Sequence, residues 1–207
     1  MSTGQDHRRR VALATKNPGK VREIASILAG APIELAGPDP AWVPPPEDAD
    51  TYRENALIKA RALVAFSGVP ALADDSGIEV DSLDGAPGPR SARYAGEGAS
   101  DEENLHKLLE VVRQTPPSAR GARYRCVAVL VTPAGDEHVS EATVEGTLIT
   151  EPHGSGGFGY DPIFVPTGAS RTMAELSAEE KDAISHRGKA FRALIPALRT
   201  LSARGET

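Results

Sequence analysis

The stretch Pro70-Ala71-Leu72-Ala73-Asp74-Asp75-Ser76-Gly77-Ile78-Glu79-Val80 places two adjacent carboxylates between two short apolar runs. The first run is typical of a buried strand, so we expect Asp74 and Asp75 to stand at a strand end. Carboxylates are costly to bury without a positive partner, which can be a divalent metal, a lysine or an arginine. Gly77 permits a sharp turn or the close approach of a ligand. Taken alone, the stretch indicates either a functional loop or ordinary turn chemistry.

The composition of the 207-residue chain bounds what it can do. At roughly 150 residues per domain, it forms one compact domain or two small lobes. A net charge of -6 argues against general nucleic-acid binding, and Arg8-Arg9-Arg10 is interpreted as part of a flexible tail over residues 1–10. The single cysteine, Cys126, fits a reducing cytoplasm. No apolar run approaches the ~20 residues of a membrane span, so no membrane partner is expected.

Upstream of the acidic pair, Val11-Ala12-Leu13-Ala14 predicts a buried first strand, followed by Thr15-Lys16-Asn17-Pro18-Gly19-Lys20. Asn17 is a favoured N-cap and Pro18 suits the first helical position, so a helix should begin here. Such a turn gathers free backbone N–H groups and two lysines, an arrangement that suits phosphate. A well-capped helix with solvated lysines is the alternative, and the local sequence leaves both open.

Start and stop signals predict most other elements. Residues 33–36 indicate a second strand, and 37–50 a stiff Pro- and Asp-rich loop that contains Glu47, either positioned or simply solvated. Residues 122–132 and 137–150 predict an antiparallel hairpin. Pro196 should kink or break the last helix. Three pairs with capping-box spacing mark helix starts: Thr51 and Glu54, Ser100 and Glu103, and Ser177 and Glu180.

Three further segments carry candidate ligand contacts. In His153–Pro162, four glycines within residues 154–159 surround Phe158, which either stacks on a flat ligand or packs into the core of an irregular turn. Arg90 and Arg93 either meet an anionic ligand or pair with nearby acids. The pair His186-Arg187 either donates to carbonyl or phosphate oxygens or is solvated.

Four segments together resemble the non-standard purine nucleoside triphosphate pyrophosphatases, also called ITPases or dITP/XTP diphosphatases. They are Thr15–Lys20, Asp74–Gly77, Gly157-Phe158-Gly159-Tyr160-Asp161-Pro162 and Ser185-His186-Arg187-Gly188-Lys189-Ala190. The resemblance extends from about Val11 to Leu198. Each motif alone is weak, but the four occur in the order and approximate spacing of the family.

The resemblance implies an α/β fold with a mixed central sheet flanked by helices. It implies an elongated, two-lobed shape with the active-site cleft between the lobes, formed by one catalytic domain over residues 11–203. It further implies Mg²⁺-dependent hydrolysis of ITP, dITP and XTP to the monophosphate and pyrophosphate, and a cytoplasmic homodimer.

The resemblance also assigns roles to individual residues. It makes Asp75 the proton acceptor and a metal ligand, with Glu47 as the second ligand. For Asp74 we expect a supporting role, holding the loop or an outer water. Phe158 would stack on the base, and His186 and Arg187 would lie near its 6-oxo edge. The full set implied to bind substrate is Thr15, Lys16, Asn17, Pro18, Gly19, Lys20, Ser76, Phe158, Gly159, Tyr160, Asp161, Lys181, His186 and Arg187.

Some residues depart from the family pattern. Lys16 and Pro18 replace Gly and smaller residues, Arg90 stands where an apolar or aromatic residue is expected, and Asp48-Ala49-Asp50 differs from the usual Thr-Gly pattern after Glu47. Three other functions remain as alternatives. They are a diphosphatase for another modified nucleotide, such as a pyrimidine, a nucleotide sensor without turnover, and nucleic-acid binding through Arg8–Arg10.

Overall fold

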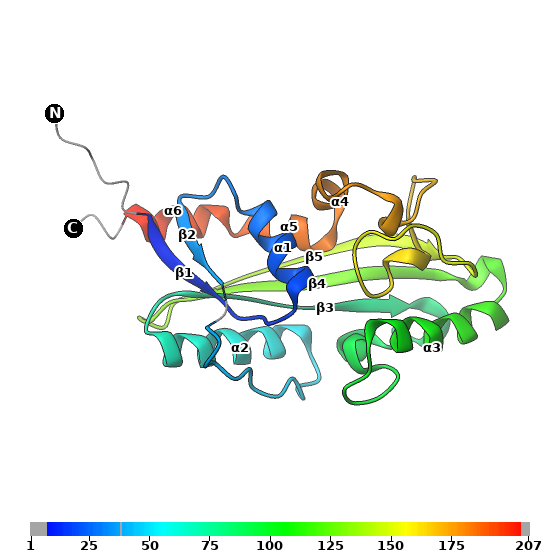
Figure 1. The fold of residues 1–207 in the computed structure, drawn as a ribbon, viewed down its shortest axis with the longest axis horizontal. Helices are drawn as coiled ribbons and strands as arrows, with labels where there is room; N and C mark the ends of the chain where they lie inside the picture. The colour runs from blue at the N-terminus through cyan, green and yellow to red at the C-terminus, as the bar shows by residue number, and fades with distance from the viewer. Residues whose placement is uncertain (1–7, 38, 204–207) are drawn as a thin grey trace.

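A six-stranded mixed sheet runs along the long axis of the computed structural model, which describes residues 8–37 and 39–203 (Figure 1). The strands lie in the order β2-β1-β3-β4-β5-β6. β1 is parallel to β2 and β3, and the remaining neighbours are antiparallel. The strand bounds are Arg9–Leu13 (β1), Ile33–Ala36 (β2), Ala71–Val80 (β3), Gly121–Val131 (β4), Glu137–Leu148 (β5) and Phe164–Pro166 (β6). The predicted mixed α/β fold is therefore confirmed.

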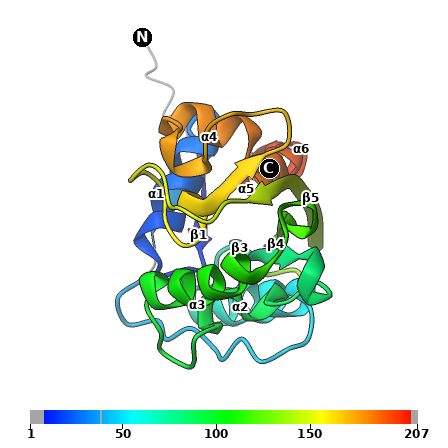
Figure 2. The same ribbon diagram turned by 90° about the vertical axis from the view of Figure 1, so that its right-hand side faces the viewer.

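Helices cover the sheet from both sides. α2 and α3 lie on one side, whereas α1, α4, α5 and α6 lie on the other (Figures 1 and 2). Their bounds are Pro18–Ile27 (α1), Tyr52–Ser67 (α2), Asp101–Gln114 (α3), Ala178–Ile184 (α4), His186–Ala193 (α5) and Ile195–Ala203 (α6). Short 3₁₀ helices cover Asp81–Leu83, Gly88–Arg93, Pro117–Ala119, Asp161–Ile163 and Met173–Glu175. Among the described residues, no helix is both long and apolar enough to cross a membrane.

The helix starts follow the predicted capping residues. Asn17 accepts from two first-turn N–H groups of α1, and Thr51 accepts from the Glu54 N–H of α2. Ser100 and Ser177 form complete capping boxes. Gly68 closes α2 in the left-handed conformation, with φ 68°. The final helix is interrupted at Leu194, just before Pro196, as predicted.

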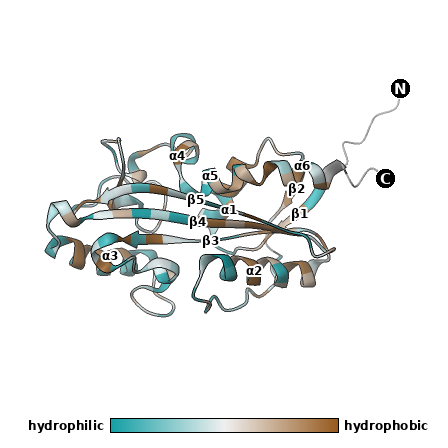
Figure 3. Ribbon diagram, turned by 180° about the vertical axis from the view of Figure 1, so that it is seen from behind, coloured by the Kyte–Doolittle hydropathy of each residue, from teal (hydrophilic) through white to brown (hydrophobic). Residues whose placement is uncertain are grey.

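Apolar side chains concentrate where helices cover the central strands, as the brown part of β4 indicates (Figure 3). Residues 127–131 of β4 are all buried. Their odd-numbered members join the core under α2, and their even-numbered members join the core under α1 and α5. Because both faces of the sheet are covered here, we expect β4 to hold the neighbouring part of β3, with Asp74 and Asp75, in a fixed position.

Two strand boundaries differ from the predictions. β1 begins at Arg9, two residues early, because Arg9 and Arg10 pair with Ile33 and Glu34 of β2; residues 1–7 of the predicted tail lie outside the described residues. β3 is one continuous strand through Asp74 and Asp75, so the prediction of a strand end there was wrong.

Gly77 lies within β3 without turning the chain. A Cβ atom at this position would lie 2.3 Å from the Gly88 carbonyl oxygen and 2.4 Å from the Ser91 Oγ. The missing side chain therefore serves close packing of the Gly88–Arg93 turn against the strand.

The short β1 leaves space beside the acidic pair. β1 pairs with β3 only at Ala71 and Leu72. Beyond them, in the described part of the chain, no strand lies along the β1 side of residues 74–77. Side chains from both faces of the sheet can reach this open edge.

Candidate active site

A cavity of about 430 Å³ lies at the open edge of β3, within the size range of small-molecule sites. Most of the predicted site residues line it: Thr15, Lys16, Asn17, Lys20, Glu47, Asp75, Ser76, Phe158, Gly159, Tyr160, Asp161, Lys181, His186 and Arg187. Pro18 and Gly19 do not line it. Pro18 is exposed, and Gly19 is buried under the ring of Phe158.

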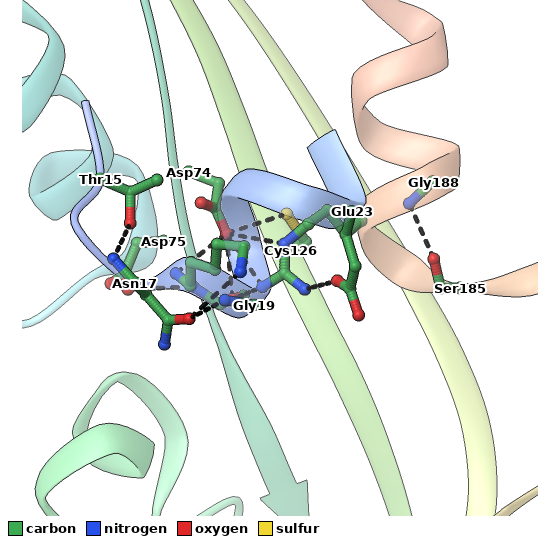
Figure 4. A network of polar contacts seen from close by, with 12 residues as sticks. Thr15, Asn17, Gly19, Glu23, Asp74, Asp75, Cys126, Ser185 and Gly188 are labelled. Atoms are coloured by element: carbon green, nitrogen blue, oxygen red, sulfur yellow. Dashed lines mark hydrogen bonds and ion pairs between the residues drawn. The ribbon is translucent and has the colours of Figure 1, made fainter. Parts of the chain in front are cut away.

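Asp74 faces α1 and α5. Its Oδ2 lies 3.1 Å from the Lys20 Nζ and 3.2 Å from the Arg187 Nη2, within the contact network of Figure 4. Burial alone would raise the pKa of this carboxyl, but the charges of Lys20 and Arg187 hold the pKa well below its usual range. Asp74 is therefore an ionised structural group that pairs directly with two cations.

Asp75 faces the opposite side of the sheet, as alternation along a strand requires. Its Oδ2 accepts from the Asn55 Nδ2 of α2 at 3.0 Å. Burial raises the pKa of Asp75 to about 6, against the charges of Lys59 and Lys20, and nearby Glu47 raises it further. The carboxylate thus lacks full charge compensation, which makes it the stronger proton acceptor of the adjacent pair.

Two carboxylates, Asp75 and Glu47, are available to Mg²⁺ in the cavity. Glu47 lies in the same cavity wall, and its Oε2 is 2.8 Å from the Lys59 Nζ. Within residues 8–37 and 39–203, no three or more His, Cys, Asp or Glu side chains form a metal cluster. Mg²⁺ is commonly bound by one or two carboxylates, with water and substrate phosphates completing the shell. The assignment of Asp75 and Glu47 as ligands stays a prediction.

The expected cluster of free N–H groups at the start of α1 is absent from the described turn. The Gly19 and Lys20 N–H groups both donate to the Asn17 Oδ1, at 2.8 and 3.1 Å, and Pro18 has no N–H. Positive charge at this wall of the cavity instead comes from side chains, with Lys16, Lys20 and Lys59 all lining it. The prediction of free backbone donors was wrong because the cap that starts the helix also occupies them.

Phe158 lies half-buried in the cavity wall over Gly19 of α1, between Gly157 and Gly159, both of which have positive φ. Its ring centroid is 5.0 Å from the Lys181 Nζ and 5.5 Å from the Arg187 Cζ. The ring is therefore part of the cavity wall and not of the core. Its stacking on a base stays a prediction.

His186 and Arg187 are buried, so the alternative of a solvated pair is wrong. The Arg187 guanidinium already pairs with Glu23 and Asp74 and donates to the Ser76 Oγ at 2.8 Å. Burial, then the charges of Arg187 and Lys181, hold the pKa of His186 well below its usual range. The imidazole is therefore neutral, with one N–H and one lone pair.

Arg90 and Arg93 occupy different positions relative to the cavity. Arg93 lines the cavity, donates to the backbone oxygen of Glu47 and lies 3.6 Å from the Glu97 carboxylate. It therefore ties the Glu47 loop to the opposite wall. Arg90 is exposed and does not line the cavity.

Comparison with known proteins assigns the chain to a family. The Ham1 family model matches residues 11–197. The chain belongs to the Ham1 family. A Streptomyces coelicolor relative named dITP/XTP pyrophosphatase is 52% identical over 196 residues, which cover 93% of this chain and 98% of that protein. The family predicted from the four motifs is thereby confirmed.

Solved Ham1 structures support the fold. A HAM1 protein from Coxiella burnetii is 38% identical with a TM-score of 0.80, covering 93% of this chain and 99% of the other. A nucleoside-triphosphatase, also titled dITP/XTP pyrophosphatase, from Mycobacterium abscessus is 43% identical with a TM-score of 0.71, covering 91% and 99%.

Three residues that contact side chains of the site in this Ham1 chain received no site role from the sequence: Glu23, Asn55 and Lys59. Glu23 bridges Lys181 and Arg187 from α1. Asn55 and Lys59 are buried one turn apart on α2, beside Ala56 and Ala60. Polar residues on the apolar stripe of an amphipathic helix were the available signal, since such positions are normally apolar.

Proposed function

We propose that this chain hydrolyses non-standard purine nucleoside triphosphates (ITP, dITP and XTP) to the nucleoside monophosphate and pyrophosphate. This reaction clears them from the nucleotide pool before they enter DNA and RNA. The observation that best supports this proposal is that Asp75 and Glu47 line the same cavity as three lysines and the glycine-flanked ring of Phe158. These lysines are Lys16, Lys20 and Lys59. Names of relatives such as the Streptomyces coelicolor dITP/XTP pyrophosphatase support the substrate class.

In the proposed reaction, water attacks the α-phosphorus, a new P–O bond forms, and the bond from the α-phosphorus to the bridging oxygen breaks. Asp75 accepts the proton of the attacking water. Pyrophosphate leaves with the electron pair of the broken bond, toward the lysines near the start of α1. In the metal-free protein, burial lifts the pKa of Asp75 to about 6, from ~3.9 for a free aspartate. The rest of the catalysis is positioning and electrostatics.

Mg²⁺ is the proposed cofactor, with Asp75 and Glu47 as its protein ligands. Bound there, it supplies positive charge that neutralises the phosphate oxygens. Lys59 contributes in the same place, because its Nζ lies against Glu47 and its charge acts on Asp75.

Base selection is proposed to come from donors beside Phe158. A 6-oxo purine accepts hydrogen bonds from the His186-Arg187 wall, whereas the amino group of adenine would leave those donors unpaired. Unpaired buried donors can discriminate by orders of magnitude.

The test is pyrophosphate release from ITP, XTP, GTP and ATP at saturating Mg²⁺, with a modified pyrimidine triphosphate in the same panel. Release from ITP and XTP well above that from ATP and the pyrimidine supports the proposal. Binding without release would favour the sensor alternative, and preferential release from the pyrimidine would favour the other diphosphatase.

We further propose that the enzyme acts in the cytoplasm as a homodimer that engages neither nucleic acid nor membrane. The resemblance to the family supports the dimer, and the net charge of -6 supports the absence of nucleic-acid binding. Sedimentation of the purified protein tests the dimer directly.

A further inference from the structure

Tyr124 joins two walls of the cavity from the centre of the sheet. It lies on β4, directly opposite Ile78 of β3 on one side and Val144 of β5 on the other. The side chain is buried yet lines the cavity. A residue on a strand paired along both edges is a rigid support for its neighbours.

The ring of Tyr124 lies parallel to the imidazole of His186. The two centroids are 4.6 Å apart, with 5° between the planes. Phe164 packs edge-on against the same tyrosine, with centroids 4.8 Å apart. The phenol is therefore held between a core aromatic and the imidazole that lines the cavity.

The hydroxyl end of Tyr124 is also anchored. Burial, followed by the charge of Asp161 and a hydrogen bond with it, raises the pKa of the phenol well above its usual value. Asp161 in turn accepts from the Phe158 N–H at 2.9 Å and pairs with Lys181. The phenol thus links α5 to the Gly-rich loop.

No hydrogen bond at Nδ1 fixes the plane of the His186 imidazole in the described part of the chain. This nitrogen is buried. A neutral imidazole offers a donor on one nitrogen and an acceptor on the other, so rotating the ring changes which one a ligand meets. Whatever fixes the ring plane therefore fixes what the cavity offers to a base.

We propose that Tyr124 is a positioning residue for base selection: its ring, stacked on His186, holds the imidazole in the plane from which it recognises a 6-oxo purine. This proposal rests on the proposed function for its substrate. Tyr124 itself need not touch the nucleotide.

The test compares Tyr124→Phe, which keeps the stacked ring, with Tyr124→Leu, which removes it. Val112→Ala is the matched control, because it removes buried carbons from the same core cluster on α3 without touching His186.

Pyrophosphate release from ITP and ATP gives kcat and KM for each variant. We expect Tyr124→Leu to lower the ITP-to-ATP ratio of kcat/KM by about tenfold or more, the loss of one positioned polar contact. Tyr124→Phe should stay within about threefold of wild type, and Val112→Ala should leave the ratio unchanged. An unchanged ratio in Tyr124→Leu, or equal losses in the Leu and Phe variants, would overturn the proposal.

An NMR measurement tests the stacking of Tyr124 on His186 independently of the proposed function. The ring current of a stacked phenol shifts the His186 ring-proton resonances upfield, and these resonances are assigned by their loss in His186→Gln. The shift should persist in Tyr124→Phe and disappear in Tyr124→Leu. If wild type releases no pyrophosphate, the proposed function fails while the stack is still tested. If the resonances do not move in Tyr124→Leu, the stack does not set the imidazole and the inference fails.

Discussion

Asp74 and Asp75 are adjacent in β3, yet their carboxylates lie on opposite faces of the sheet and contact different side chains. Asp74 is shared by Lys20 and Arg187, on the side of α1 and α5. Asp75 faces α2, where it accepts from Asn55 and feels the charge of Lys59. One acid is fully compensated, and the other is poised to accept a proton or a cation.

Asp74→Asn should destabilise the fold, because it leaves the buried Arg187 and the Lys20 ammonium without their shared counter-charge. Breaking a buried pair in this way costs about 3–5 kcal/mol. Urea unfolding of the metal-free protein measures the loss. Glu141→Gln is the control, since its ion pair with Arg125 is exposed and contributes about 0–1 kcal/mol. Equal stabilities for the two variants would contradict the structural role of Asp74.

The contribution of His186 to stability should fall as the pH drops below about 6.5, the pKa of an unperturbed histidine. Folding lowers the pKa of His186, so below this pH the unfolded chain binds a proton that the folded chain does not. The contribution of His186 to the free energy of unfolding is therefore constant above pH 6.5. Below that pH it declines by about 1.4 kcal/mol per pH unit for one proton. His186→Gln should flatten this slope and exposed His106→Gln should not; a slope that persists in His186→Gln rules out this origin.

Gly19→Ala should weaken substrate binding without unfolding α1. A Cβ at position 19 would lie 2.7 Å from the Phe158 Cδ1, so the ring must move from the cavity wall. Overpacking of this kind costs about 1–3 kcal/mol, and 1.4 kcal/mol corresponds to about a tenfold rise in KM for ITP. At Gly30 an added Cβ meets nothing within 4 Å, so Gly30→Ala should behave as wild type. A normal KM in Gly19→Ala would show that the position of Phe158 does not matter.

Glu47→Gln should raise the Mg²⁺ concentration needed for half-maximal activity by about tenfold or more. The fold should tolerate the change, because the Glu47 side chain is 36% exposed. Titration of Mg²⁺ into chelator-treated enzyme gives the value. An unchanged Mg²⁺ requirement would remove Glu47 from the metal site.

Features that depend on neighbouring residues were predictable from the sequence. Asn17, Thr51, Ser100 and Ser177 start helices through hydrogen bonds within three residues, so their signals are complete in the local sequence. Pro133–Asp136 likewise identified the turn between β4 and β5.

Features that depend on distant partners were not predictable. The charge of Asp74 inside the strand is balanced by Lys20 and Arg187, which lie 54 positions before and 113 after it in the chain. The free N–H groups at α1 were lost to the cap that predicted the helix. The role of Glu23 depends on Lys181, which is 158 positions away. Contacts between residues so far apart in the chain cannot be predicted from local sequence patterns.

Turnover of Asp75→Asn is the most direct test of the account. The substitution removes the proposed proton acceptor and metal ligand while keeping the size of the side chain and a partner for Asn55. Pyrophosphate release from ITP should fall by about 100-fold or more, as expected for a lost general base. The urea midpoint of the metal-free protein should stay near wild type, because the Asp75 charge is under-compensated in the fold. Near-normal turnover in this variant would contradict the assignment of the chemistry to Asp75.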